Sequence, residues 1–398
     1  MALKPYKYIE DFSALEEKVN GERIAYLDNA ATTHKPNQVI EALKDFYTRH
    51  NANPGKSLHE LANRAKRKLD QSRETVADFI NASPEEAVFT RNCTESINLV
   101  SQSLEIEGKI IIPEMSHHSN QLPWRKKAER RGLEIEYIPT KENQLDIEAA
   151  KDLIDSNTGI VSASHISNVF GCRNPVKTLA DLAHDNNALI LVDGAQSVPR
   201  LPTDVRDIDA DFLAFSSHKM CGPTGTGVLY GKKNLLEELE SYQVGGGMVR
   251  TVEKSNIEFE PGPERFEAGT ENVAGAVGLA EAVKYLEEIG LDKIYRHEKQ
   301  LSKRIIQGLE DLDNVKIYAP DNACLVSFHI EDIHPHDVSE ILNSRGIAIR
   351  SGHHCAQLQM EKLGITGTSR ASPYLYNTEK DIDRFLEAVQ EAQEVFER

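Results

Sequence analysis

The sequence predicts an α/β protein with a mostly parallel β-sheet covered by helices, joined to a second, smaller α+β domain. Short runs of almost continuous apolar residues recur through the first two thirds of the chain, a pattern that is typical of strands buried on both faces. Helical patterns separate these runs, and such alternation favours a parallel sheet. The 398 residues are enough to build two hydrophobic cores.

Six apolar runs form the predicted sheet. They are 86–90, 109–113, 159–164, 188–193, 211–216 and 227–231. After the first run, the stretch TESINLVSQSL places Ile97, Val100 and Leu104 on one face of a helix. Ligands of open parallel sheets bind at the carboxyl ends of the strands. The residues that follow each run are therefore the candidate site residues.

The pattern changes near residue 265. Two long helical stretches, 272–290 and 291–312, are followed by short apolar runs and by a C-terminal helical stretch, 379–396. We interpret this change as the start of a separate small domain. The predicted units are an N-terminal helix packing with the small domain, a large domain and the small domain itself, at 1–20, 21–265 and 266–398.

Composition excludes several classes of partner. The formal net charge of −17 argues against nucleic acid or an anionic membrane as the main partner. No apolar run approaches the roughly 20 residues that span a bilayer, and the N-terminus has no apolar segment typical of a secretory signal. The five cysteines are widely spaced and form no Cys-x-x-Cys pair, so we expect neither a disulfide framework nor a metal site, and a cytoplasmic location.

Polar residues with distinct chemistry follow the apolar runs. Thr94 opens a helix, whose N-terminus suits an anion; a role only as an N-cap is the alternative. His117 and His118 follow the next run, without a third residue at metal-ligand spacing. Asp193 ends a buried run, which is unfavourable unless the carboxylate meets a cation or donors. Lys219 precedes a glycine-rich stretch.

Together these residues place an anion site, an imidazole ring, a carboxylate and an amine at one edge of the sheet. Pyridoxal 5′-phosphate requires such a set. A lysine forms the Schiff base, a carboxylate pairs with the pyridinium nitrogen, and a helix N-terminus holds the phosphate.

Eight short motifs that follow one another along the chain resemble those of a known enzyme family. From about Tyr26 to the end, the chain resembles the cysteine desulfurase/selenocysteine lyase family, in class V of the fold-type I pyridoxal-phosphate enzymes. The resemblance implies a large domain with a mostly parallel seven-stranded sheet and a small α+β domain, and the motif around Cys355 resembles the group II branch. The motifs are YLDNAATT, HHSN, SHISNVFG, VDGAQS, SSHKMCGPTGTG, FEAGT, RSGHHCA and SRASPYLYNT.

The resemblance implies a role for each residue that would contact the cofactor ring. Lys219 stands where the family has its Schiff-base lysine, and Asp193 where it has the pyridinium partner. Gln196 matches the residue that bonds the phenolic oxygen, and His117 the one that stacks on the ring and shuttles protons. Asn168 matches a residue near the cofactor oxygen and the substrate.

The resemblance also implies residues for the phosphate and for the substrate. Thr270 matches a phosphate ligand supplied by a second subunit, which implies a homodimer. Arg370 matches the arginine that binds the substrate carboxylate, and Arg350, just before the cysteine loop, is expected as a second anchor. The phosphate ligands expected within one chain are Thr94, Ser216 and His218, and Cys93 is a further expected cofactor-binding residue.

Cys355 resembles the family's sulfur acceptor; an inert buried cysteine and a zinc ligand are the alternatives. The predicted reaction converts L-cysteine to alanine and leaves a persulfide on Cys355, from which an acceptor or iron–sulfur scaffold protein takes the sulfur. L-Selenocysteine is an alternative substrate. Two other functions compete: a selenocysteine lyase or other class V lyase or transaminase that does not use Cys355, and a non-enzymatic scaffold. Departures from the family pattern occur at 51–59, at Leu358 and at Glu271.

Overall fold

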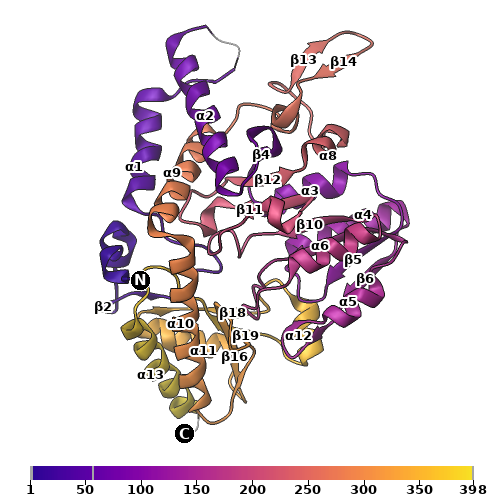
Figure 1. The fold of residues 1–398 in the computed structure, drawn as a ribbon. Helices are drawn as coiled ribbons and strands as arrows, with labels where there is room; N and C mark the ends of the chain where they lie inside the picture. Colours follow the sequence, from indigo (N-terminus) through magenta and orange to yellow (C-terminus); the bar gives the residue numbers. More distant parts are fainter. Residues whose placement is uncertain (1–2, 56–57, 397–398) are drawn as a thin grey trace.

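The computed structural model describes residues 3–55 and 58–396. Its large sheet has seven strands in the order β4-β12-β11-β10-β9-β5-β6, with helices on both faces (Figure 1). All are parallel except β12, which runs antiparallel to both neighbours. In sheet order the strands are Ala87–Thr90, Gly227–Gly231, Phe212–Ser216, Leu189–Asp193, Thr158–Ser164, Lys109–Pro113 and Ile135–Ile138.

The six predicted strands are therefore confirmed to within one residue at each end, and β6 is an additional edge strand. Alternate residues of the central strands enter two different cores. Ile110 and Ile112 belong to one core, whereas Ile111 between them belongs to the other. Burial on both faces explains why these strands read as continuous apolar runs.

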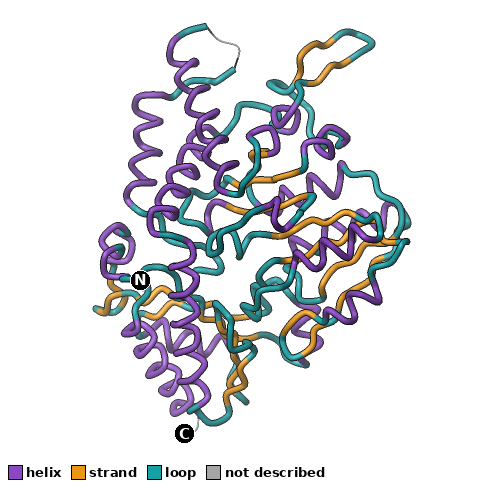
Figure 2. Tube along the Cα trace, in the orientation of Figure 1, coloured by secondary structure: helices purple, strands orange, loops and turns teal. Residues whose placement is uncertain are grey.

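Two sets of helices cover the large sheet. On one face, α3 (Cys93–Ser103) and α4 (Leu122–Arg131) bury residues such as Val100 and Trp124. On the other face, α6 (Val176–Asp185) packs on β9 and β10, and α9 (Val273–Ile289) packs between α1 and α2. Figure 2 shows the helices around the strands. The remaining helices of this part are α1 (Asn37–Asp45), α2 (Glu60–Phe79), α5 (Ile147–Leu153), α7 (Val205–Ile208) and α8 (Lys233–Glu238).

A small antiparallel sheet lies below the large sheet in the view of Figure 1. It has four strands in the order β15-β16-β19-β18, and its core includes residues of α10, α11 and α13. The predicted combination of a large, mostly parallel sheet with a small α+β part is confirmed, while the boundary at residue 265 stays a prediction. The elements are β15 Val315–Ile317, β16 Val326–Ile330, β18 Arg350–Gly352, β19 Thr368–Ala371, α10 Leu291–Glu310, α11 Pro335–Ser344 and α13 Glu379–Phe396.

The N-terminal segment differs from the helix predicted for 1–20, of which residues 1 and 2 lie outside the described residues. Three short 3₁₀ turns take its place, at Pro5–Lys7, Ile9–Asp11 and Ser13–Glu16. Phe12 packs edge-on against Tyr285 of α9 and against Tyr376. These tertiary contacts outweigh a helical periodicity that is too short to be stable by itself.

Short elements complete the chain. The hairpin of β13 (Val249–Val252) and β14 (Ile257–Phe259) projects from the same end of the molecule as the start of α2 (Figure 1). No helix within residues 3–55 and 58–396 is long and apolar enough to cross a membrane. The other short strands are β1 Lys18–Val19, β2 Glu22–Arg23, β3 Ala25–Tyr26, β7 Thr140–Lys141, β8 Gln144–Leu145 and β17 Ile347–Ala348.

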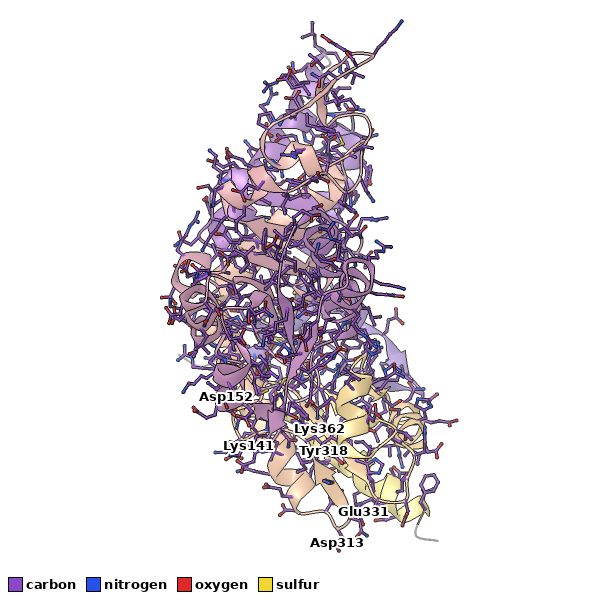
Figure 3. The ribbon with its side chains drawn as sticks, turned by 90° about the vertical axis from the view of Figure 1, so that its right-hand side faces the viewer. Lys141, Asp152, Asp313, Tyr318, Glu331 and Lys362 are labelled. Atoms are coloured by element: carbon purple, nitrogen blue, oxygen red, sulfur yellow. The ribbon has the colours of Figure 1, made fainter. Side chains whose placement is uncertain are left out.

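Contacts of Arg200 and Lys362 are among those that join the large-sheet part of the molecule to the small-sheet part. Arg200, which follows β10, forms an ion pair with Glu298 of α10 (Nε to Oε2, 2.9 Å), and neither side chain is exposed to solvent. On α12 (Gln357–Leu363), Lys362 binds Glu114 (2.6 Å) and the carbonyl of Thr140 (3.1 Å). Figure 3 labels Lys362 close to Lys141. The helix that follows Cys355 is thereby held against the edge of the large sheet.

Candidate active site

A cavity of about 320 Å³ lies where the strands of the large sheet end. The register of the sheet aligns Asp193 at the end of β10 with Ser164 at the end of β9, so residues from distant parts of the sequence meet at one edge. The cavity brings together every predicted site residue except Thr270. These are Cys93, Thr94, His117, Asn168, Asp193, Gln196, Ser216, His218, Lys219, Arg350, Cys355 and Arg370.

Asp193 and Lys219 leave polar groups available to a ligand. Oδ1 of Asp193 accepts hydrogen bonds from the backbone of Ala195 (3.0 Å) and from the thiol of Cys93 (3.4 Å). Among the described residues, neither Oδ2 of Asp193 nor Nζ of Lys219 has a hydrogen-bond partner. Burial lowers the pKa of Lys219 to about 8, and burial raises the pKa of Asp193. An unpaired carboxylate oxygen and a partly neutral amine thus face the same cavity.

The start of α3 forms the wall predicted to bind a phosphate. Ser216 Oγ accepts a hydrogen bond from the backbone of Cys93 (2.8 Å), and Thr94 Oγ1 lies 2.7 Å from Ser119 Oγ. Burial lowers the pKa of His218 to about 4, so its ring is neutral at pH 7. Hydroxyl groups at a helix N-terminus suit a phosphate. Sequence reasoning missed Ser119, although the HHSN motif contains it.

His117 has a defined tautomer. Its Nδ1 accepts a hydrogen bond from the backbone of Ser119 (3.0 Å), which leaves the proton of the neutral ring on Nε2. Burial, together with the positive charge of Lys219, lowers the pKa of His117 to about 3. The ring is therefore a neutral imidazole at the cavity wall, suited to stacking and to donating through Nε2.

Arg370 on β19 is the buried cation of the site. Its Nη1 donates to the carbonyl of Asn168 (2.8 Å), and its Nε is buried without a partner among the described residues. Burial lowers the pKa of Arg370 to about 10, so the guanidinium is charged at neutral pH. Such a group fits a ligand carboxylate in the cavity, because a buried guanidinium nitrogen without a hydrogen-bond partner is unfavourable.

Two amide side chains that line the cavity, Asn168 and Gln196, form hydrogen bonds to the protein around it. Asn168 Nδ2 donates to the carbonyl of His354 (2.7 Å) and so fixes the turn before Cys355. Gln196 donates to the carbonyl of Ala30 (2.7 Å) and accepts from Arg200 Nη1 (2.8 Å). Both amide side chains are therefore oriented by the protein.

Cys355 lies at the cavity in a backbone conformation that is unusual for its residue type. Its φ is +54° and that of His354 is +52°, in the left-handed region that side chains other than glycine rarely adopt. Contacts hold this turn: the backbone of His118 donates to the carbonyl of Cys355 (2.7 Å), and the backbone of Cys355 donates to His353 Nδ1 (3.1 Å). Leu358, one of the departures from the family pattern, lies in the first turn of α12.

Thr270 does not line this cavity. It is exposed, and its hydroxyl accepts a hydrogen bond from Asn53 (3.3 Å). The described residues of 53–59 also lie outside the cavity, and residues 56 and 57 lie outside the described residues. The role of Thr270 in a second subunit stays a prediction. Within residues 3–55 and 58–396, no cluster of three or more His, Cys, Asp or Glu residues is arranged to hold a metal ion.

Comparison with known proteins identifies the family. Residues 25–385 match the family described as Aminotransferase class-V. The chain belongs to the class-V aminotransferase family. A relative of this family from Haloferax volcanii, named cysteine desulfurase, is 44% identical over 97% of this chain and 96% of its own length. The resemblance to class V and to the cysteine desulfurases is therefore confirmed.

Solved structures agree with the class-V assignment. The apo structure of cysteine desulfurase from Thermococcus onnurineus NA1 aligns with a TM-score of 0.93 and 39% identity, covering 98% of this chain and 99% of that chain. The cysteine desulfurase CsdA from Escherichia coli, with an S-sulfonic acid, aligns with a TM-score of 0.92 and 34% identity, covering 99% and 100%. The fold is thus the fold-type I architecture predicted from the sequence.

Class-V enzymes use pyridoxal 5′-phosphate, and the cavity fits this group. Oδ2 of Asp193 is available for a protonated ring nitrogen, Nζ of Lys219 for an aldehyde, and the hydroxyls of Thr94 and Ser216 for a phosphate. The side chains that could hold the cofactor therefore face one cavity.

Proposed function

We propose that the protein is a cysteine desulfurase, which converts L-cysteine to L-alanine and transfers the sulfur to Cys355 as a persulfide. One observation carries the proposal: a cysteine in a strained turn lines the same cavity as Lys219, Asp193 and the buried Arg370. A lyase that releases pyruvate would need the last three residues but no thiol at the cavity. The names of the relatives support the same reaction.

In the proposed mechanism, Arg370 binds the substrate carboxylate and so orients the amino acid in the cavity. The bound cofactor supplies an electron sink that makes the α-proton acidic and the Cβ–S bond labile. Lys219 removes the α-proton, and the neutral ring of His117 donates a hydrogen bond through Nε2. The thiolate of Cys355 attacks the substrate sulfur, so an S–S bond forms as the Cβ–S bond breaks. Protonation then completes alanine.

The experiment is incubation of the purified holoprotein with L-cysteine. We expect alanine in the solution and a Cys355 peptide whose mass increases by one sulfur atom. Pyruvate in place of alanine, with an unmodified Cys355, would instead indicate an elimination lyase. No product and no change of the cofactor spectrum would indicate the non-enzymatic scaffold.

We also propose that the sulfur passes from Cys355 to an acceptor protein, such as an iron–sulfur scaffold, since the persulfide must be cleared before the next turnover. Cys355 is the one partly exposed cysteine of the chain, and the other four are buried. All five are free thiols, which supports a reducing location such as the cytoplasm.

The rate at which the cofactor-free protein links pyridoxal phosphate should depend on pH. The neutral amine of Lys219 is the reactive form, and burial lowers the pKa of this lysine to about 8. We expect the rate to rise about tenfold per pH unit below 8 and to level off above it. Absorbance of the linked cofactor measures the rate. A rise that continues to pH 10, as for an ordinary lysine, would contradict the lowered pKa.

We propose a homodimer in which Thr270 completes the site of the partner. Three large apolar side chains that flank Asn53 in the sequence are exposed: Tyr47, Leu58 and Leu61 are 61%, 96% and 46% exposed. A partner subunit that covered them would remove this apolar surface from water. Light scattering of the purified protein should give twice the monomer mass.

Mixing two inactive variants tests whether Thr270 acts across the dimer. In a heterodimer of Lys219→Ala and Thr270→Ala, one site would carry both substitutions and the other neither. Because random reassociation gives about half heterodimers, we expect about a quarter of the wild-type activity to return. If Thr270 acted within its own chain, every site would carry one substitution and no activity would return.

A further inference from the structure

Two arginines at the candidate substrate site lie directly opposite each other. Arg350 on β18 pairs with Arg370 on β19 in the antiparallel register, where like charges destabilise a strand pair. Asp28 contacts both. Its carboxylate accepts from Arg350 Nε (3.2 Å to each oxygen) and Nη2 (3.1 Å), and Arg370 Nη2 lies 3.5 Å from Oδ1. One carboxylate is thus the shared counterion of two guanidinium groups.

The backbone fixes the position of Asp28. The amide of Leu27 donates to the carbonyl of Ala348 (2.8 Å), and the amide of Ser372 donates to the carbonyl of Leu27 (2.7 Å). The side chain of Asp28 is only 15% exposed, and it is not among the residues that line the cavity. Asp28 therefore contacts the two arginines without lining the cavity itself. It acts on a ligand through them, as a positioning residue.

The contacts of Asp28 are unequal. Arg350 makes three hydrogen bonds to it, whereas Arg370 makes one long contact and keeps a buried Nε without a partner in the described part of the chain. Two positive charges meet one negative charge, so the three side chains together carry a single net positive charge. That charge is located mainly on Arg370, at the cavity wall.

We propose that Asp28 restricts the site to amino acids with one carboxylate. This inference rests on the proposed function, in which Arg370 binds the α-carboxylate and the substrate side chain is directed toward Cys355. Arg350 and Cys355 line the same cavity. With Arg370 bound to the α-carboxylate, Arg350 is the remaining arginine among the described lining residues for an acidic substrate side chain. Asp28 occupies Arg350 and repels a second negative charge, which leaves acidic amino acids without a counterion.

The test compares L-asparagine with L-aspartate, which have nearly the same shape and differ by one charge. Binding to the holoprotein is followed by the change in cofactor absorbance, which requires no turnover. We expect the wild-type protein to bind asparagine at least about tenfold more tightly than aspartate. In Asp28→Asn, aspartate should gain at least about tenfold relative to asparagine, because Arg350 is released.

Two further variants separate this role from a merely structural one. Asp28→Glu retains the carboxylate and should keep the wild-type order of the two ligands. Adding Arg350→Gln to Asp28→Asn should remove the gain for aspartate, since the released cation is then absent. An Asp28→Asn protein that binds cofactor but keeps the wild-type ratio would overturn the proposal.

The comparison does not depend on the stability of the variant. If Asp28→Asn fails to fold, equal binding of aspartate and asparagine by the wild-type protein still overturns the proposal, and the expected preference for asparagine supports it. Failure of the underlying function is distinguishable, because a wild-type holoprotein whose spectrum does not respond to L-cysteine lacks an amino-acid site altogether.

Discussion

Replacement of Lys219 by alanine is expected to abolish alanine formation from L-cysteine, with a loss of at least about 10³-fold in turnover. Lys219 provides the only lysine amine that lines the cavity among the described residues, and burial lowers its pKa to about 8. The variant should also lack the absorbance of the cofactor linked to the lysine. Cofactor should still bind through its phosphate at the start of α3, because Thr94 and Ser216 are unchanged.

Lys219→Arg is the matched control. It keeps a positive charge near Asp193 but provides no amine that can link to an aldehyde. We expect it to be as inactive as the alanine variant. An arginine variant with substantial activity would mean that the charge, and not the amine, is the essential property. Unchanged activity of Lys219→Ala would overturn the assignment of this residue.

Cys355→Ala should lose L-cysteine desulfuration by a similar factor, about 10³-fold or more, while it retains cofactor and substrate binding. No thiolate then remains to accept the sulfur, whereas Asp193, Lys219 and Arg370 are untouched. Binding is measured by the change in cofactor absorbance on addition of L-cysteine, and turnover by alanine. A normal binding signal without alanine is the expected combination.

Cys172→Ala provides the control for loss of a thiol. Burial raises the pKa of the Cys172 thiol to about 12, so this cysteine is unreactive at neutral pH, and it does not line the cavity. We expect its replacement to leave turnover within about twofold of the wild-type value, as is usual away from a site. Alanine formation by Cys355→Ala at the wild-type rate would exclude Cys355 as the sulfur acceptor.

The buried strands could be predicted from the sequence because their side chains enter cores on both faces. The direction of β12 could not, since a strand buried on both faces has the same apolar pattern whichever way it runs. β6 was missed because it is an edge strand of half-buried residues with Glu136 in its middle. The N-terminal turns depend on Phe12 meeting Tyr285 and Tyr376, residues that lie far away in the sequence.

The candidate site was predictable where its residues lie at or soon after the end of a buried strand, as Asp193 at the end of β10 and Lys219 after β11 do. Sequence alone does not show which partners these residues have in space. The contact of Asp28 with Arg370 joins positions 342 residues apart, and no spacing rule relates them. Nor does the sequence show that Asn168 fixes the turn at Cys355, because that contact depends on how the small sheet is placed against the large one.

The ion pair of Arg200 and Glu298 has a consequence for how this protein can change over evolutionary time. Both side chains are fully buried, and removing one member of such a pair costs about 3–5 kcal/mol, comparable to much of a domain's stability. Replacing both by apolar residues of similar volume costs far less. Descendants of this sequence should therefore keep both residues or lose both. Since Arg200 also holds Gln196, a joint loss would require a new support for that amide.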